Sequence, residues 1–407
     1  MTEPVTTRAS FPDGFSWGTA TAAHQIEGGN WNNDWWRHEH QPGTLCAEPS
    51  GDACDSYHRW AEDADLVASL GFTDYRFSVE WSRVEPAPGE WSVAALDHYR
   101  RICDGLTARG VNPVVTLHHF TTPRWLADLG GWESADTVER FATFCEKVAV
   151  ALGDVMTRAC TINEPNVVAF YGWSFGVFPP GKRDPDLADR VTRTFIDAHR
   201  AAVEAIRTAA PGVPVGLTLS MSDWAAVGDG DDRTRAEAKL ARYREFMEDR
   251  FLAATEGDDF IGVQAYSRAR VGPDGVLRTG EEGVPMLPMG YELWPQALEA
   301  TLRRAWEVTG GRVPLLVTEN GIGTDDDDQR ISYVERALEG VLRAIADGVD
   351  VRGYTYWSLL DNFEWVFGYR PKFGLVSVDR TTFERTPKPS AAWLGEIARA
   401  GTLPGDA

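Results

Sequence analysis

The chain has 407 residues, of which 43% are hydrophobic, and it carries a formal net charge of −21. This length suits one large α/β barrel. The strong negative charge argues against nucleic acid and anionic membrane surfaces as partners, and no apolar run reaches the about 18 residues of a membrane-spanning helix.

The N-terminal sequence MTEPVTTRASFPDGFSWG lacks a basic segment followed by an apolar one, so we expect no signal peptide. The cysteines are odd in number, and no two have CxxC spacing. This pattern argues against a disulfide framework or a zinc site and indicates reduced thiols in a cytoplasmic protein. Only Cys46 and Cys54 share one loop-like region. The five cysteines are Cys46, Cys54, Cys103, Cys145 and Cys160.

Eight short runs rich in β-branched and aromatic residues follow one another along the chain, and each is typical of a buried strand. Longer segments with helical periodicity separate them. The predicted strands cover residues 15–21, 71–79, 111–118, 158–163, 214–220, 259–266, 313–320 and 351–359.

Two of the intervening segments show the helical pattern clearly. In residues 134–153, apolar side chains recur from Val138 to Val148 at helical spacing, and residues 189–212 end at Pro-Gly. Eight alternations of strand and helix predict parallel β/α units. A doubly wound sheet is the competing architecture. The count of eight, and the absence of a GxGxxG motif at the first helix, favour a single (β/α)8 TIM barrel domain over residues 1–407.

A TIM barrel places its active site at the C-terminal ends of the strands. Polar and aromatic residues gather at those ends in this sequence, which makes them candidate site residues. We interpret the acidic stretch TDDDDQR (324–330) as a solvated loop and not as a metal site. The residues at the predicted strand ends are Gln25, Arg76, His118, His119, Asn163, Glu164, Tyr266, Glu319 and Trp357.

Two strands end in the same way, in TINEP (161–165) and VTENG (317–321), and each ending contains a glutamate. Two opposed carboxylates suit cleavage of a glycosidic bond, because one can stay ionised while the other donates a proton. Arg76, if it lies near Glu319, favours the ionised form of that carboxylate. Glu164 has no cation in its motif, so we expect its pKa to be raised. The alternative is that each glutamate only caps or pairs locally.

Four motifs, in order, resemble glycoside hydrolase family 1, the β-glucosidase family. They are FSWGTATAAHQIEG (15–28), TINEP, VTENG and YTYWSLLDNFEWVFGYRPKFGLVSVD (354–379). The resemblance covers nearly the whole chain. It implies a (β/α)8 barrel and a retaining double displacement on β-linked sugars, with Glu164 as acid/base, Glu319 as nucleophile, and no metal or organic cofactor.

The same resemblance implies a set of sugar-binding residues. Tyr266 matches a tyrosine that orients the nucleophile, and Trp357 would form the stacking floor. Each aromatic residue also has a purely structural interpretation, Phe373 above all, and we interpret His118 as structural. The implied substrate-binding residues are Gln25, His119, Asn163, Tyr266, Trp357, Glu364, Trp365 and Phe373, with Arg76 supporting the nucleophile.

The sequence also departs from the family pattern. Phe120 stands where the family commonly has tryptophan, residues 264–266 read QAY and not Asn-Tyr-Tyr, and residues 178–181 read FPPG. The chain also looks short, so we expect trimmed rim loops. These changes bear on glycone and leaving-group preference. An aromatic leaving-group site is one further hypothesis, with outer-shell packing as the alternative, for Trp36, Phe120, Trp125, Trp173 and Phe178.

Three activities remain open from the sequence. Hydrolysis of a small-molecule or oligosaccharide β-glycoside is the first, and transfer of the same covalent intermediate to another acceptor is the second. A catalytically silent sugar-binding barrel is the third, although both glutamates are present. Glu364 would repel a phosphate at the sugar 6-position, which argues against a 6-phospho-glycosidase. The sequence fixes neither the natural glycoside nor the oligomeric state.

Overall fold

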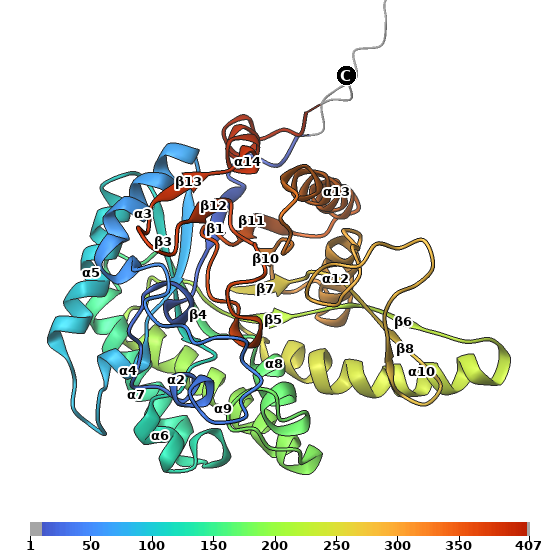
Figure 1. Ribbon diagram of the computed structural model, residues 1–407, viewed down its shortest axis with the longest axis horizontal. Helices are drawn as coiled ribbons and strands as arrows, with labels where there is room; N and C mark the ends of the chain where they lie inside the picture. The colour runs from blue at the N-terminus through green and yellow to red at the C-terminus, as the bar shows by residue number, and fades with distance from the viewer. Residues whose placement is uncertain (1–9, 405–407) are drawn as a thin grey trace, which may run out of the picture.

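The computed structural model describes residues 10–404, and the first half of the N-terminal segment for which we expected no signal peptide, residues 1–9, lies outside this range. Eight parallel strands close into a barrel in the order β1-β11-β10-β7-β5-β4-β3-β2, which confirms the predicted fold (Figure 1). All eight predicted strands are present. They are β1 (Ser16–Ala20), β2 (Asp74–Ser78), β3 (Asn112–His119), β4 (Arg158–Asn163), β5 (Val215–Ser220), β7 (Phe260–Gln264), β10 (Leu315–Asn320) and β11 (Val351–Trp357).

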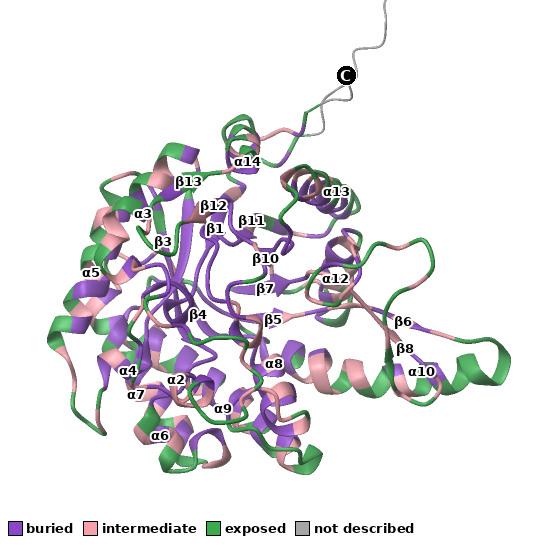
Figure 2. Cartoon of the chain, in the orientation of Figure 1, coloured by how far each residue is buried: buried purple, intermediate pink, exposed green. Residues whose placement is uncertain are grey.

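Helices surround the barrel, with buried faces toward the strands and exposed faces outward (Figure 2). The longer helices are α3 (Ser56–Leu70), α5 (Val93–Thr107), α7 (Asp136–Leu152), α9 (Pro185–Ala209), α12 (Ala297–Val308), α13 (Asp327–Ala346) and α14 (Pro389–Ala400). Short helical segments lie in the connections: α1 (Ala23–Ile26), α2 (Asp34–Glu39), α4 (Trp81–Val84), α6 (Arg124–Asp128), η1 (Gly131–Glu133), α8 (Pro165–Ala169), η2 (Phe170–Ser174), η3 (Glu245–Asp249), α11 (Arg250–Ala254) and η4 (Trp365–Phe367).

The two helices singled out from the sequence are present as α7 and α9. In α7 the side chains of Phe141, Phe144 and Val148 are buried, as the helical spacing predicts. Helix α9 begins earlier than predicted, because Asp184 accepts a hydrogen bond from the Leu187 N–H and Pro185 occupies the first turn. The helix ends just before Pro211, as its sequence indicates.

The acidic stretch 324–330 is not a solvated loop throughout, and that prediction was wrong in part. Its second half opens helix α13, where the Asp326 side chain accepts a hydrogen bond from the Gln329 N–H. Asp327 forms an ion pair with Arg330 one turn later. Carboxylates in a first helical turn are stabilised by the helix dipole, which explains a run of aspartates at this position.

Two small sheets outside the barrel were not predicted, because their strands are short. One contains β6 (Asp223–Ala226), β8 (Arg268–Val271) and β9 (Leu277–Arg278); the other pairs β12 (Val376–Val378) with β13 (Arg385–Pro387). The first sheet projects from the barrel beside α10 (Gly230–Arg244), as Figure 1 shows. Trp224 and Tyr243 stack between that sheet and that helix, with 5.4 Å between ring centroids.

The register of the barrel strands brings distant residues level with one another at the C-terminal end. Trp357 of β11 pairs with Ala20 of β1, and His119 of β3 pairs with Asn163 of β4. Glu319 of β10 lies opposite Gln264 of β7. The fold therefore gathers the predicted strand-end residues at one mouth of the barrel. No helix in residues 10–404 is both long and apolar enough to cross a lipid bilayer.

Candidate active site

Glu319 lies near the end of β10, and its carboxylate is buried between two donors. Arg76 Nη1 of β2 donates to Glu319 Oε1 at 2.6 Å, and the Tyr266 hydroxyl donates to Glu319 Oε2 at 2.6 Å. Arg76 itself is fully buried. The predicted proximity of Arg76 to Glu319 and the predicted hydrogen bond from Tyr266 are thus both present, and both of them favour the ionised carboxylate.

A further layer of hydrogen bonds lies behind this pair. The Tyr333 hydroxyl donates to the Tyr266 carbonyl at 2.7 Å, and the Asn320 amide donates to the Ala265 carbonyl at 2.6 Å. The Tyr354 hydroxyl in turn donates to Asn320 Oδ1 at 2.9 Å. These contacts fix the backbone that carries Tyr266 and hence its hydroxyl toward Glu319.

Glu164 follows β4 and precedes Pro165, which begins helix α8. Its backbone is in the left-handed region, with φ 44° and ψ 54°, a conformation that is uncommon for a residue with a side chain. The residue is buried, with 8% of its surface exposed. Among residues 10–404, no arginine, lysine or histidine forms an ion pair with its carboxylate, in contrast to Glu319.

The two carboxyl groups interact, and their surroundings push their pKa values apart. Burial raises the pKa of Glu164 well above its ordinary value, and the nearby charge of Glu319 raises it further. Burial also raises the pKa of Glu319, but Arg76, Tyr266 and Gln264 oppose this effect. A proton shared by the pair therefore resides on Glu164, and Glu319 carries the charge.

Asn163 connects this pair to the rest of the site. Its Oδ1 accepts hydrogen bonds from Arg76, from Gln264 Nε2 at 2.8 Å and from Thr218 Oγ1 at 3.2 Å. Its Nδ2 lies 3.2 Å from His119 Nε2. Three donors on one oxygen fix the amide orientation, so the NH₂ group faces the mouth of the barrel beside His119.

On the opposite side of the mouth, Gln25 and Glu364 lie together. Gln25 Nε2 donates to the Phe363 carbonyl at 2.7 Å and lies 3.3 Å from Glu364 Oε2. Burial and the charge of Glu319 raise the pKa of Glu364 to about 8. Gln25 Oε1 and His119 Nδ1 are buried and have no hydrogen-bond partner among the described residues. Buried polar atoms without partners are rare, and these two suit a polar ligand.

Aromatic rings form the walls of the same region. His119 stacks on Trp357, with 5.6 Å between ring centroids and 21° between planes, and on Trp365, at 6.2 Å and 15°. Phe373 meets the edge of Tyr266 at 6.0 Å. An apolar face beside several hydrogen-bonding groups matches the two sides of a sugar ring, with its C–H face and its hydroxyls.

The residues named from the sequence therefore fall into two groups. The catalytic and substrate-binding candidates converge on the mouth. His118, by contrast, is buried among Trp132, Phe141 and Phe195, and burial lowers its pKa to about 3. It lies on the outer side of the barrel, which is consistent with its interpretation as a structural residue.

The proposed leaving-group residues also divide. Phe120 and Phe178 form one aromatic group with Trp365, since Phe120 lies 4.8 Å from Trp365 and 5.6 Å from Phe178 between ring centroids. The Trp173 indole instead donates to Glu133 at 2.9 Å, and the Trp125 indole donates to the Glu85 carbonyl at 2.9 Å. Trp36 stacks on His40. Only the two phenylalanines join the aromatic wall.

Sequence reasoning missed three contributors to the site. Gln264 donates to Asn163 and stabilises ionised Glu319, and Thr218 also donates to Asn163. Gln264 ends β7 and Thr218 lies two residues before the end of β5, and this position is the signal that could have identified them. Tyr291 packs beside Trp357 and Phe373, but it comes from a long connection that gives no strand-end signal.

No group of three or more histidine, cysteine, aspartate or glutamate side chains within residues 10–404 is arranged to hold a metal ion. All five cysteines are free thiols, including the pair Cys46 and Cys54 that share a loop region. The polar groups described at the mouth are carboxylates, amides, the Arg76 guanidinium, the His119 imidazole and the Tyr266 hydroxyl.

Comparison with known proteins gives a consistent assignment. The chain is 36% identical to "Thermostable beta-glucosidase B" of Thermobispora bispora, over 97% of this chain and 92% of that protein. The alignment spans 441 positions, more than the 407 residues here, so the relative carries residues that this chain lacks.

Two solved structures share the fold and the sequence. The structure of beta-glycosidase BGL167 has a TM-score of 0.89 and 48% identity, covering 98% of this chain and 99% of that one. The beta-glucosidase from Thermotoga maritima in complex with glucoimidazole has a TM-score of 0.91 and 31% identity, covering 97% and 100%. The family model for glycosyl hydrolase family 1 matches residues 7–260 and 255–402. This chain therefore belongs to glycosyl hydrolase family 1.

Proposed function

We propose that the protein is a retaining β-glycosidase, most specifically a β-glucosidase, that hydrolyses its substrate by double displacement. One observation carries this proposal: two buried carboxyl groups lie at the same barrel mouth in opposite electrostatic environments. Glu319 receives hydrogen bonds from Arg76 and Tyr266, whereas burial raises the pKa of Glu164. Such an arrangement suits a nucleophile and a proton donor.

In the first step, Glu319 attacks the anomeric carbon and the bond to the leaving oxygen breaks. Glu164 gives its proton to that oxygen, so the leaving group departs as a neutral alcohol. In the second step, Glu164, now ionised, takes a proton from water as the water oxygen attacks the anomeric carbon. The bond to Glu319 breaks, and both carboxyl groups return to their initial states. We expect the carboxyl groups to lie about 5–5.5 Å apart.

The remaining site residues receive binding roles in this proposal. Trp357 supports the apolar face of the sugar, and Glu364, the Trp365 indole and Gln25 Oε1 bind hydroxyl groups. Phe373 closes the pocket beside Tyr266. Asn163 and His119 bind the hydroxyl next to the anomeric carbon, a contact that strengthens as the transition state forms. The unpartnered buried atoms of Gln25 and His119 support this assignment.

The choice of a β-glucoside rests on the relatives, which are named beta-glucosidases, and on the glucoimidazole complex of one of them. We further propose that the reaction needs no cofactor, because the two carboxyl groups supply both chemical roles. A cytoplasmic location is proposed on the five free thiols, which suit a reducing compartment.

The test is hydrolysis of 4-nitrophenyl β-D-glucoside followed by proton NMR of the first-formed sugar. We expect turnover, with β-glucose appearing before mutarotation produces the α-anomer. Initial release of α-glucose would contradict double displacement. Binding of glucose without turnover would instead indicate a silent sugar-binding barrel. Products formed with an added alcohol measure how far the intermediate is diverted to transfer.

A further inference from the structure

Residues 358–372 form a loop that joins Trp357 to Phe373 and carries Glu364 and Trp365; we call it the 358–372 loop. The segments at its two ends, residues 358–361 and 372–375, lie against each other, and we call this paired region the neck. The Leu375 N–H donates to the Ser358 carbonyl at 2.9 Å, and the Ser358 N–H lies 3.4 Å from the Phe373 carbonyl. Four predicted sugar-binding side chains thus depend on the conformation of one loop and its neck.

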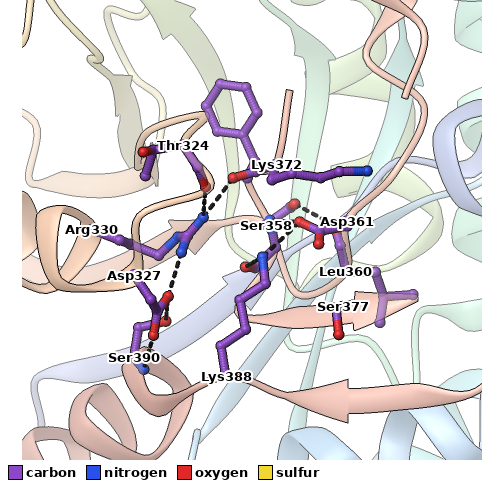
Figure 3. Close-up of polar contacts among 12 residues, drawn as sticks. Thr324, Asp327, Arg330, Ser358, Leu360, Asp361, Lys372, Ser377, Lys388 and Ser390 are labelled. Carbon is purple, nitrogen blue, oxygen red and sulfur yellow. Dashed lines mark hydrogen bonds and ion pairs between the residues drawn. The ribbon is translucent and has the colours of Figure 1, made fainter. Parts of the chain in front are cut away.

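Arg330 of α13 reaches this neck from the helix side (Figure 3). Its Nη2 donates to the carbonyls of Lys372 and Thr324, each at 2.6 Å, and its Nε donates to the Tyr356 hydroxyl at 3.1 Å. The Tyr356 hydroxyl donates to the Phe373 carbonyl at 3.0 Å. Arg330 therefore connects Tyr356, which precedes Trp357, with Lys372, which precedes Phe373.

The Thr324 contact extends the same connection to the nucleophile strand. Thr324 follows β10, which carries Glu319, by four residues. One guanidinium therefore ties together the segments that present Glu319, Trp357 and Phe373. Arg330 is 1% exposed, and its charge is balanced by Asp327, which also accepts hydrogen bonds from the Ser390 N–H and hydroxyl.

Lys388, the residue before helix α14, ties the same neck from another side (Figure 3). Its Nζ donates to Asp361 Oδ1 at 2.9 Å and to the Gly374 carbonyl at 2.7 Å. Asp361 Oδ1 also accepts from the Gly374 N–H at 2.8 Å. A side chain at position 374 would overlap the backbone of Leu360 and Asp361, so the two ends approach as closely as glycine permits.

A buried arginine can contribute to stability without affecting the active site, and Arg385 is such an arginine in this protein. Its side chain is 1% exposed, like that of Arg330, and it pairs with Asp63 of α3 at 2.9 Å. Its other contacts are Ser56 and the Phe383 carbonyl. None of these groups belongs to the 358–372 loop or to a residue of the site, which makes Arg385 a matched control.

We propose that Arg330 and Lys388 are positioning residues, which close the neck of the 358–372 loop and so hold Glu364 and Trp365 against the substrate. Their cations satisfy buried carbonyls that would otherwise separate to find water. This inference rests on the proposed β-glycosidase function. It concerns substrate binding through the loop and leaves the chemistry of Glu164 and Glu319 unchanged.

The test compares Arg330→Lys, Arg330→Met and Lys388→Met with Arg385→Lys and with the unaltered protein. Lysine keeps the charge but cannot reach three acceptors at once. Steady-state kinetics with 4-nitrophenyl β-D-glucoside are measured over a range of pH, well below each variant's melting temperature. Hydrogen exchange is followed in peptides that cover residues 358–374.

We expect the Arg330 and Lys388 variants to lose about ten- to a hundredfold in kcat/KM, mainly through KM, with unshifted pH limbs and faster exchange in the loop. Arg385→Lys should lower the melting temperature comparably and leave KM within about twofold. Equal KM values in the Arg330 and Arg385 variants would overturn the inference. An inactive unaltered protein would instead refute the proposed function, which separates the two failures.

Discussion

The barrel holds an arginine–carboxylate pair at each end, and the two pairs have different surroundings. At the N-terminal end, Arg158 pairs with Asp74 and also donates to Ser16 Oγ at 3.2 Å, while Asn112 donates to Asp74 at 2.8 Å. Each of these residues begins or lies near the start of a barrel strand. This end therefore joins four neighbouring strands through hydrogen bonds between protein side chains.

The C-terminal end uses the same chemistry with a different result. Arg76 pairs with Glu319, but Gln25 Oε1 and His119 Nδ1, although buried, have no hydrogen-bond partner within residues 10–404. Incomplete hydrogen bonding near a buried ion pair weakens the folded state and leaves room for a ligand's hydroxyls. The contrast indicates that one end of the barrel maintains the fold and the other end binds and reacts.

The largest effect on activity is expected when the nucleophile at the C-terminal end of the barrel is removed. We expect Glu319→Gln to lower kcat for 4-nitrophenyl β-D-glucoside by about 10⁴-fold or more, because the amide cannot form the covalent intermediate. The matched variant Glu164→Gln should instead release one rapid burst of nitrophenolate, since an activated leaving group needs little acid catalysis, and then turn over slowly. Near-normal turnover of Glu319→Gln would refute the nucleophile assignment.

A site residue could be predicted from the sequence when its role is marked by a short motif around it. Glu164 and Glu319 could be identified because each stands in a short motif at the end of a strand. The contact between Arg76 and Glu319 joins residues 243 positions apart, and only the barrel topology made it a reasonable expectation. The left-handed conformation of Glu164 was not predictable, because Pro165 restricts the preceding residue without selecting that region.

The supporting contacts were beyond sequence reasoning for a different reason. Arg330 lies in a helix and has no strand-end signal, and its acceptors are mostly backbone carbonyls, which every residue has. Thr218 and Gln264 do lie at or near the ends of their strands, but their partners follow only from the register of β5 and β7 beside β4 and β10. Sequence patterns indicate which groups react, while the groups that orient them become visible only in three dimensions.

A smaller effect is expected from the hydroxyl that orients Glu319. Tyr266→Phe removes one hydrogen bond to the carboxylate, and we expect kcat/KM to fall by about 10²-fold. The hydrogen bond lowers the pKa of Glu319, so its loss should raise that pKa and move the acidic limb of the pH–rate profile to higher pH. A shift to lower pH, or none, would contradict this role for Tyr266.

The control for that variant is a tyrosine buried on the outer side of the barrel. The Tyr75 hydroxyl lies 2.8 Å from Thr21 Oγ1, so Tyr75→Phe also removes one buried hydrogen bond. We expect it to change stability by about 1 kcal/mol and to leave the pH–rate profile in place. Comparing the two variants separates an effect on Glu319 from the general loss of a buried hydroxyl.

The smallest effect on activity is expected at the opposite end of the barrel. Arg158→Met breaks the pair with Asp74, whose side chain is 7% exposed, so a nearly buried carboxylate loses its cation. Because Arg158 is partly exposed, we expect the free energy of unfolding in urea to fall by about 1–3 kcal/mol. The kcat/KM of the folded protein should stay within about twofold, since the side-chain partners of Arg158, Asp74 and Ser16, lie at the end of the barrel opposite the mouth. A large loss of kcat/KM at temperatures where the variant is fully folded would show that the two ends are coupled through the barrel interior. It would contradict the inference that one end maintains the fold while the other binds substrate and reacts.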